Sequence, residues 1–405
     1  MNRSPEKPRV LIVGCGFPQL GLLRAARSLG AYVVGVDGNP EAIGVGVCDR
    51  FELASTHDAD AIAAAARAAR VDGISTAGSE LALGTTVRAA EKLGMPFYGD
   101  AATVERAQAK DQMRAAYRAG GAPIPEYAVA TSFDDVRAFV DGRGLPIIIK
   151  PSKGWGQRGV SKVEHESELA AAYDGAHRAS STGQVLVEEF IDGSEFSVNA
   201  YTVDGTTTAY CVTERVITQY PNPPGITFAE WYPAGISSEL VRQAQDAAAA
   251  GVRALGIRRG PTYTQLRISS KGARLVETAY RLGGGLDPDV TLLASGISLF
   301  RKILGVALGL PEWETTGVES ERHGGAIGHF LVGRPGRVLR VEGLDEARAM
   351  PGVVAAEVYV RPGGTVHPLT DGSKRVGHVL ATGRDRDEAA SHAKTAAERI
   401  RIETA

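Results

Sequence analysis

The chain has 405 residues, of which 43% are hydrophobic and 23% are charged, and its formal net charge is -2. Since a domain usually holds roughly 100 to 200 residues, we expect two to four domains. A nearly neutral chain creates no overall field toward nucleic acid or an anionic membrane, so we expect neither as a partner. No apolar run of about 18 residues occurs, which excludes an ordinary membrane-spanning helix.

The amino-terminal part alternates strand-like and helix-like segments. Residues 9–16 read as a buried strand, 21–30 as a helix and 32–40 as a second strand, and a helix at 61–70 precedes a strand at 71–78. This alternation predicts a doubly wound parallel sheet within residues 1–100.

A glycine cluster follows the first of these strands. Gly14 and Gly16 precede an acid at Asp37, as in a dinucleotide site. The G-x-G-x-x-G pattern needs glycine at position 19, however, where this chain has Gln19. We therefore interpret the cluster as a structural turn, and an NAD-linked oxidoreductase stays as an alternative.

A second glycine-rich segment follows a helical stretch at 102–121. Lys150 ends an apolar strand, and the loop 152–160 leads into another strand. Glycines let backbone amides approach an anion, and a lysine supplies a point charge for phosphate oxygens. The segment predicts a flexible lid over a polyphosphate, and a plain β-hairpin is the alternative.

The next strand ends on two acids. Glu188 and Glu189 precede Phe190 and Ile191, and Glu195 follows. Such a strand end offers an acceptor for the amine of adenine, a backbone donor and acceptor, an apolar wall and an acceptor for ribose hydroxyls. The alternative is an acidic strand end that faces water.

Gln265 and Glu277 stand on either side of a turn at 270–272. Two antiparallel strands joined there would bring both side chains together, and oxygen ligands so placed suit magnesium. Arg281 adds a cation that could bind a carboxylate or a developing oxyanion. A surface ion pair is the alternative interpretation.

Two further segments complete the chain. Residues 214–233 are rich in proline and aromatic residues and lack a clear period, so we interpret them as a loop that frames an acceptor pocket with Arg215, Tyr220, Phe228 and Trp231. An ordered surface connection is the alternative. Strand-like segments and a late helix predict a small α+β domain at 324–405.

Taken in this order, the pieces resemble the ATP-grasp superfamily over nearly the whole chain, and most closely its carboxylate-amine ligases, including amino-acid ligases. The resemblance implies an α/β fold: an amino-terminal doubly wound parallel sheet (1–100), a central ATP-grasp α+β domain (101–323, with a lid at about 128–200) and a small α+β carboxy-terminal domain (324–405). It also implies ATP and Mg²⁺ as cofactors.

The resemblance implies a role for each matching residue. Lys110 and Lys150 match the phosphate lysines, Gln265 and Glu277 the metal ligands, and Arg281 the catalytic arginine, with Lys150 also catalytic. Contacts to the nucleotide are implied for Lys110, Lys150, Ser152, Gly154, Gly156, Gln157, Gly159, Val160, Glu188, Glu189, Phe190, Ile191 and Glu195. Substrate contacts are expected at Arg215, Trp231, Arg281 and Gly284.

Two positions depart from the family pattern. Many members have Glu where this chain has Gln265, and Asn where it has Ala279. An amide oxygen can ligate magnesium but carries no charge, so metal affinity should fall or the number of ions should change.

The expected activity is an ATP-dependent ligase that joins a small-molecule carboxylate to an amine through an acyl phosphate. A purine-pathway-type or carboxylating ATP-grasp enzyme is an alternative, and a non-catalytic nucleotide-binding module is another. The three cysteines, Cys15, Cys48 and Cys211, are too far apart in sequence for a familiar metal site and fit a cytoplasmic protein with free thiols. A homodimer is expected from the resemblance only.

Overall fold

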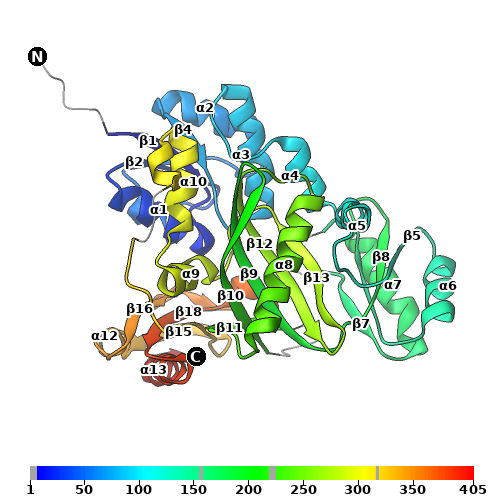
Figure 1. Ribbon diagram of the computed structural model, residues 1–405. Coiled ribbons are helices and arrows are strands. Elements are labelled where there is room, and N and C mark those ends of the chain that lie inside the picture. The colour runs from blue at the N-terminus through cyan, green and yellow to red at the C-terminus, as the bar shows by residue number, and fades with distance from the viewer. Residues whose placement is uncertain (1–6, 155–157, 219–224, 316–318) are drawn as a thin grey trace, which may run out of the picture.

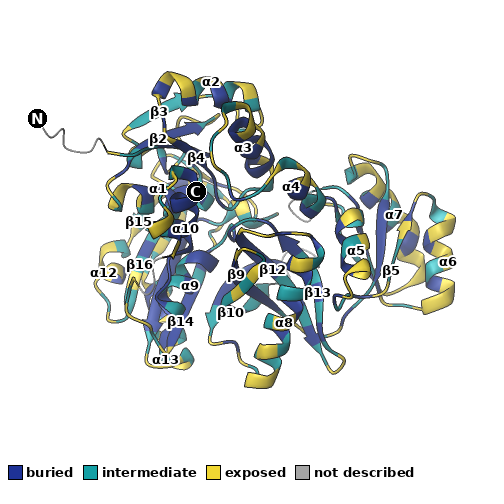
Figure 2. Cartoon of the chain, turned by 45° about the horizontal axis from the view of Figure 1, so that its top comes forward, coloured by how far each residue is buried: buried dark blue, intermediate teal, exposed yellow. Residues whose placement is uncertain are grey.

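The computed structural model describes residues 7–154, 158–218, 225–315 and 319–405. The described strands form four sheets (Figure 1). Buried strands lie in the interior of each part, and helices turn their exposed sides outward (Figure 2). The predicted fold class is confirmed.

The first sheet is parallel and has the order β3-β2-β1-β4. Its side chains alternate between two faces because successive residues of a strand point in opposite directions. Val10 and Ile12 of β1 pack with α1 and α10, whereas Leu11 and Val13 pack with α2 and α3. The elements are β1 Arg9–Val13, α1 Phe17–Ser28, β2 Tyr32–Asp37, η1 Val45–Val47, β3 Arg50–Leu53, α2 Ala59–Ala69, β4 Gly73–Ser75 and α3 Glu80–Leu93.

One helix that covers this sheet comes from much later in the chain. It is α10 (Leu299–Leu308), which lies beside α1 and β4 in Figure 1. Gly73 of β4 lies against its backbone, since a Cβ at Gly73 would come within 1.9 Å of the Ala307 carbonyl oxygen. The first sheet is therefore complete only with a segment beyond residue 100.

The predicted helical stretch at 102–121 is two helices, α4 (Ala101–Gln108) and α5 (Lys110–Ala119). The chain is extended at Ala109, with φ -92° and ψ 106°. The Lys110 amide donates to the Ser152 carbonyl oxygen at 2.9 Å instead of continuing the first helix. The break therefore connects the start of α5 to the glycine-rich segment.

The next unit is a four-stranded antiparallel sheet with the order β5-β8-β6-β7. The predicted strand, turn and strand at 145–163 is confirmed by the pairing of β6 with β7. We call this part the lid unit, and it lies at one side of the molecule in Figure 1. Its elements are β5 Tyr127–Ala130, α6 Phe133–Arg143, β6 Ile147–Pro151, β7 Ser161–Val163, η2 Glu166–Glu168, α7 Leu169–Ala179 and β8 Val185–Glu189.

An eight-stranded sheet forms the centre, with the order β13-β12-β9-β10-β11-β14-β18-β16. One face of β9 sends Phe196 and Val198 into a core shared with α8, and α9 covers part of the other face. The elements are β9 Ser194–Val203, β10 Thr206–Thr218, β11 Ile226–Tyr232, α8 Ser238–Ala254, β12 Gly260–Ser269, β13 Gly272–Ala279, α9 Asp287–Ser295, α11 Pro311–Thr315, β14 Gly325–Leu331, β16 Val353–Val358 and β18 Gly377–Gly383.

The loop expected at 214–233 needs correction here. Residues 214–218 and 226–232 of the expected loop belong to β10 and β11, which pair with each other, because their β-branched and aromatic side chains suit a sheet. β9 lies in the central sheet, so the lid unit ends before residue 194. The predicted domain boundary at residue 324 falls within this continuous sheet, since β14 pairs with β11.

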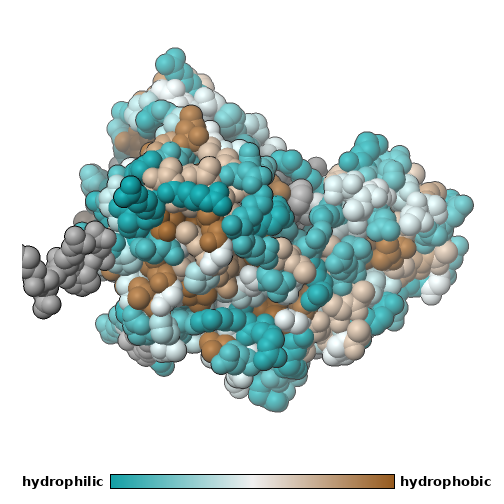
Figure 3. Space-filling view, turned by 90° about the horizontal axis from the view of Figure 1, so that it is seen from above, coloured by the Kyte–Doolittle hydropathy of each residue, from teal (hydrophilic) through white to brown (hydrophobic). Residues whose placement is uncertain are grey.

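The remaining strands form a small sheet with the order β17-β15-β19. Its neighbourhood contains β15 Gly336–Glu342, α12 Leu344–Arg348, β17 Thr365–Val366, η3 Gly372–Lys374, α13 Arg386–Arg399 and β19 Arg401–Thr404. On the face seen in Figure 3, hydrophobic side chains form small separate patches among hydrophilic ones. Among the described helices, none alone is long and apolar enough to cross a membrane, and one pair bent by 105°, α9 with α10, passes by length and composition only.

Candidate functional site

Polar side chains gather on one face of the central sheet. On β9, Ser197 and Asn199 point away from the apolar core under α8. Strand register sets Gln265 of β12 opposite Ser197 and also opposite Glu277 of β13. The expected neighbourhood of Gln265 and Glu277 is therefore present, and the pairing of β12 with β13 creates it.

Lys150 lies at the end of β6 in a buried cluster of charges. Its Nζ is 2.7 Å from a carboxylate oxygen of Glu188 on β8, and Arg114 of α5 binds the other oxygen. Arg114 also donates to the Val276 carbonyl oxygen at 2.8 Å, which connects α5 to β13. All three charged side chains are at most 7% exposed. Glu188 thus positions a phosphate lysine, in addition to its expected place beside adenine.

The cluster has one more positive than negative charge, because the single carboxylate of Glu188 pairs with two cations. Burial lowers the pKa of Lys150 to about 8, although Glu188 favours its charged form. Burial also disfavours the Glu188 carboxylate, but Arg114 and Lys150 together hold its pKa below the usual value. Lys150 is therefore the member of the cluster whose charge can change near neutral pH.

Lys110, the first residue of α5, reaches the predicted lid loop. Its Nζ donates to the Gly154 carbonyl oxygen at 3.0 Å. Ser152 is fully buried, and its hydroxyl lies 2.9 Å from that of Thr182. Gly159 has φ +71° and lies against α7, so a side chain there would be strained. The start of the loop is thus fixed, whereas Gly156 and Gln157 lie outside the described residues.

Glu277 lies among cations and is half-buried. Burial disfavours its charge, but Lys110, Lys150, Arg281 and Arg114 together lower its pKa, so the carboxylate stays ionised. Within the described part of the chain its oxygens accept no hydrogen bond and form no direct ion pair. An ionised carboxylate without a partner fits a Mg²⁺ ligand.

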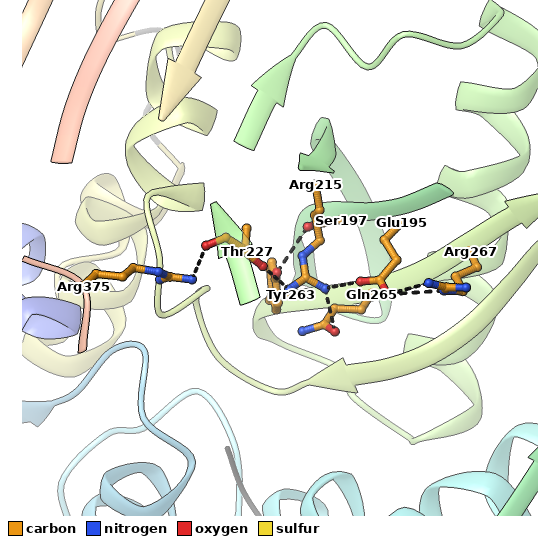
Figure 4. Close-up of polar contacts among 8 residues, drawn as sticks. All are labelled: Glu195, Ser197, Arg215, Thr227, Tyr263, Gln265, Arg267 and Arg375. Carbon is orange, nitrogen blue, oxygen red and sulfur yellow. Dashed lines mark hydrogen bonds and ion pairs between the residues drawn. The ribbon is translucent and has the colours of Figure 1, made fainter. Parts of the chain in front are cut away.

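Gln265, by contrast, already has a partner. Its amide oxygen accepts a hydrogen bond from Arg215 Nη1 at 2.9 Å, and the same nitrogen lies 3.0 Å from Glu195 (Figure 4). Glu195, the expected ribose acid, also pairs with Arg267 at 3.0 Å. The expected metal ligand and the expected ribose acid are thus joined by one guanidinium.

Arg281 reaches toward the first sheet. Its Nε is 2.8 Å from a carboxylate oxygen of Glu80, at the start of α3, and Nη1 donates to its neighbour's carbonyl oxygen. Gly284 lies nearby, and a Cβ there would come within 2.7 Å of the Gly78 carbonyl oxygen. The glycine loop 283–285 therefore brings the expected catalytic arginine to the junction with the first unit.

The side chains of the hinge residues 189–191 point in different directions, because successive side chains of an extended chain alternate between two faces. Glu189 pairs with Lys271 at 3.3 Å and with Arg143, away from Lys150. Phe190 has the Lys162 ammonium 4.3 Å from its ring centroid and the Arg267 guanidinium 4.9 Å from it. Ile191 is buried and its carbonyl oxygen accepts from Arg267 at 2.7 Å. The Glu189 amide donates to the Glu126 carbonyl oxygen at 2.9 Å.

A pair of buried acids was not foreseen from the sequence. Glu230 of β11 is 2% exposed and Asp287, at the start of α9, is 1% exposed. Burial, and next the charge of Asp287, raise the pKa of Glu230 well above its usual value. Burial also raises the pKa of Asp287. A Cβ at Gly285 would come within 2.5 Å of Glu230, so the glycine loop makes room for this acid pair.

Unsatisfied polar atoms surround the acid pair. One carboxylate oxygen of each acid and both amide atoms of Asn199 are buried without a hydrogen-bond partner, as is the Thr213 hydroxyl. Such atoms each cost roughly 1 to 3 kcal/mol and usually mark a place that water or a ligand completes. The sequence signal that could have found Glu230 is its register with Arg215, which needs the strand pairing.

Several expected substrate residues lie elsewhere. Trp231 follows Glu230 in β11 and so points to the opposite face, where Arg386 of α13 stacks on its ring at 4.6 Å. Phe228 contacts the ring of His329 edge-on at 4.6 Å. Tyr220 lies outside the described residues. Of the described residues of this group, Arg215 reaches the polar face and Trp231 does not.

The first glycine cluster is closed by its own contacts. Asp37 accepts from the Cys15 amide at 2.7 Å, and Gln19 lies under Gly14 and donates to the Ala77 carbonyl oxygen at 2.5 Å. The acid that a dinucleotide ribose would need therefore holds the turn itself. These contacts favour the structural interpretation over an NAD site.

Two family models match the chain. The ATP-grasp domain matches residues 143–289, and the L-amino acid ligase C-terminal domain 2 matches residues 329–405. The first match covers the lid unit from β6, the acidic hinge and the β12–β13 pair, up to the start of α9.

Whole relatives and solved structures agree with these matches. The uncharacterized protein y4rH of Sinorhizobium fredii is 31% identical over 307 residues. The matched stretch is 74% of this chain and 62% of that relative. A formate-dependent phosphoribosylglycinamide formyltransferase of Burkholderia vietnamiensis is 29% identical over 407 residues, which are 98% of this chain and 96% of that protein.

Among solved structures, an L-amino acid ligase from Bacillus licheniformis has a TM-score of 0.81 at 20% identity and covers 99% of this chain and 100% of its own. A biotin carboxylase domain from Hydrogenobacter thermophilus, in complex with MgADP and bicarbonate, has a TM-score of 0.81 at 16% identity and covers 98% and 90%. At these identities the likenesses establish the fold.

The fold and the match at residues 143–289 are those of ATP-grasp enzymes, a class that includes ligases that form C–N bonds. Residues 143–289 thus match an ATP-grasp domain, and residues 329–405 match the C-terminal domain 2 of L-amino acid ligases. The resemblance seen in the sequence is thereby confirmed.

Proposed function

We propose that this protein uses ATP to join a small carboxylate to an amine through an acyl phosphate, and that it releases ADP and phosphate. Amino acids are the substrate class that the carboxy-terminal match to L-amino acid ligases supports. A purine-pathway-type or carboxylating reaction is the second candidate, which the likeness to the formyltransferase favours.

The environment of Glu277 carries this proposal. An ionised carboxylate without a partner is surrounded by Lys110, Lys150, Arg114 and Arg281, which come from α5, β6 and the segment after β13. Such an excess of positive charge suits a polyphosphate and the charge that develops as phosphoryl transfer proceeds. Magnesium held at Glu277 would add neutralisation of the phosphate oxygens.

The chain's own residues supply the remaining steps of the proposed reaction. Lys110 and Lys150 hold the phosphate oxygens while the substrate carboxylate attacks the γ-phosphorus in line. Arg281 stabilises the oxyanion that forms when the amine attacks the acyl carbon, and Glu80 holds its guanidinium in place. Closure of the lid unit keeps water from the acyl phosphate.

The acid pair supplies a place for the amine. An amino acid brings an ammonium group, which must lose a proton before it attacks. An ionised carboxylate of Glu230 or Asp287 can bind the ammonium and accept that proton, which leaves a neutral amine and a protonated acid. The raised pKa values of both acids suit proton exchange better than a surface carboxylate would.

ADP release measured over pairs of amino acids, with mass spectrometry of the products, tests the proposal. We expect release that depends on both partners, and a roughly 10²- to 10³-fold lower rate for Lys150→Ala. Lys92→Ala is the matched control, since Lys92 forms an exposed pair with Asp60 on α2. Unchanged, amine-dependent ADP release by Lys150→Ala would reject the assignment.

A further inference from the structure

We infer that the nucleotide site takes a single divalent cation, at Glu277, and that the Arg215 guanidinium bound to Gln265 replaces a second one. The inference rests on the proposed function and deepens it, because it specifies the metal content of the same site. Its basis is the different state of two residues that the sheet places opposite each other, Gln265 and Glu277.

The one atom of Gln265 that could bind a metal already accepts a hydrogen bond from a cation. Its amide oxygen accepts from Arg215 Nη1 at 2.9 Å, and the amide nitrogen is a donor that cannot bind a cation. A divalent cation at this oxygen would also lie next to a guanidinium and be repelled by it. The Glu277 carboxylate, in contrast, accepts no hydrogen bond and forms no direct ion pair in the described part of the chain.

Arg215 is fixed in this position from several sides. Nη1 pairs with Glu195 at 3.0 Å, and Nη2 donates to the Thr227 hydroxyl at 2.5 Å. A β-bulge between Val216 and Ile217 shifts the register of β10 and β11 and brings Thr227 within reach. The side chain is 8% exposed, so the guanidinium cannot turn into solvent without losing these contacts.

The sheet holds the guanidinium in a row of alternating basic and acidic side chains. Across β12, β9, β10 and β11 this row reads Arg267, Glu195, Arg215 and Glu230, and register places Arg267 opposite Glu195 and Arg215 opposite Glu230. A guanidinium stays protonated in proteins, so this positive charge is permanent.

The charge balance explains how one cation can suffice. A glutamate with a bound divalent cation presents a net charge of about +1 to the phosphates, because about -1 and +2 combine. Neutral Gln265 with Arg215, Arg267 and the Glu195 carboxylate that both arginines share also presents about +1. The substitution of an amide for the acid and the presence of the arginine thus preserve the local charge.

Among the described residues, no group of three or more His, Cys, Asp or Glu side chains could hold a metal ion.

Counting the bound metal tests the inference without turnover. The full-length chain is mixed with a non-hydrolysable ATP analogue and titrated with Mn²⁺, and bound and free metal are separated by electron paramagnetic resonance. We expect one Mn²⁺ for each bound nucleotide and no spin-coupled pair signal. Two Mn²⁺ ions would overturn the inference and leave the ligase proposal intact. Absence of nucleotide binding would reject both.

Three variants sharpen the test. In Arg215→Ala, we expect the ATP analogue to bind roughly 10- to 100-fold more weakly, since a charge-assisted contact is lost. Gln265→Glu should still bind one Mn²⁺, because the new carboxylate would pair with Arg215. The double variant Gln265→Glu, Arg215→Ala should bind two. One ion in the double variant, with unchanged affinity in Arg215→Ala, would show that the guanidinium does not stand in for a cation.

Discussion

The charge of Lys150 depends on its surroundings more than that of any other proposed phosphate contact. Its ammonium is buried next to Glu188, but Arg114 competes for the same carboxylate and Lys110 adds a further positive charge. Burial is the largest of these effects and lowers the pKa to about 8. Since a polyphosphate needs the charged form, nucleotide binding should depend on this one proton.

The pH dependence follows from the sign of that shift. Below pH 8 the Lys150 amine is charged, and the affinity for ATP should be nearly constant. Above that pH the free protein loses the proton, so we expect the Kd for ATP to rise up to roughly tenfold per pH unit. Equilibrium binding of ATP between about pH 6.5 and 9.5, without other substrates, measures this effect.

Lys150→Arg provides the control for this prediction, because a guanidinium stays charged throughout the range. The variant should bind ATP with little dependence on pH. A native Kd that is constant up to about pH 9.5 would show that the charge of Lys150 does not limit binding.

The sequence alone identifies some residues of the candidate site and misses others. Lys110, Lys150, Glu277 and Arg281 stand at strand or helix ends, and their types alone suggest phosphate and metal chemistry. Arg114 and Glu230 are hidden in ordinary helix and strand patterns, and their roles appear only when α5 meets β8 and when β10 pairs with β11. The side of the sheet on which Trp231 lies was not predictable, because a strand residue points to one of two faces and the loop interpretation assigned no strand.

At the scale of elements, α10 and β4 show a contact between distant segments. Gly73 lies so close to the backbone of Ala307 that no side chain fits between them. Gly73→Ala should therefore push α10 away from the first sheet and lower the free energy of unfolding by about 1 to 3 kcal/mol. Urea-induced unfolding followed by circular dichroism measures the change.

Gly46→Ala is the matched control for this substitution. Gly46 lies in η1 of the same unit, its φ is not positive, and a Cβ there would meet nothing within 4 Å. We expect its unfolding free energy to stay within about 0.5 kcal/mol of the native value. Equal stability of the two variants would mean that α10 moves without cost.

The elements themselves were largely predictable where the sequence period is clear. The parallel order of the first sheet and the β6–β7 and β12–β13 pairs follow from alternating patterns and turns. The break at Ala109 was not predictable, since its cause is a hydrogen bond from Lys110 to Ser152, which is 42 residues away. Contacts of this kind depend on tertiary structure and have no local pattern.

At the scale of the whole molecule, the central sheet crosses the boundary expected at residue 324. β14, β18 and β16 extend β11 and cover Trp231. A chain that ends at residue 323 would expose the edge of β11 and the apolar side of Trp231, so we expect it to aggregate. Size-exclusion chromatography of the truncated and full-length chains tests this.

Co-expression of residues 324–405 with the truncated chain is the companion experiment. If the missing strands cause the aggregation, the separate segment should restore part of the soluble material. A monodisperse truncated chain with native stability would indicate that the two parts fold independently in spite of their shared sheet.

The late position of α10 also affects how the chain is made. The strands of the first sheet emerge from the ribosome early. The helix α10, which covers Val10, Ile12 and the apolar side of α1, is complete only roughly 230 residues after β4. At about 5 to 20 residues per second, one apolar face of the new sheet stays uncovered for on the order of 10 to 50 s during synthesis. During that time the nascent chain offers a chaperone a binding surface that disappears when α10 docks.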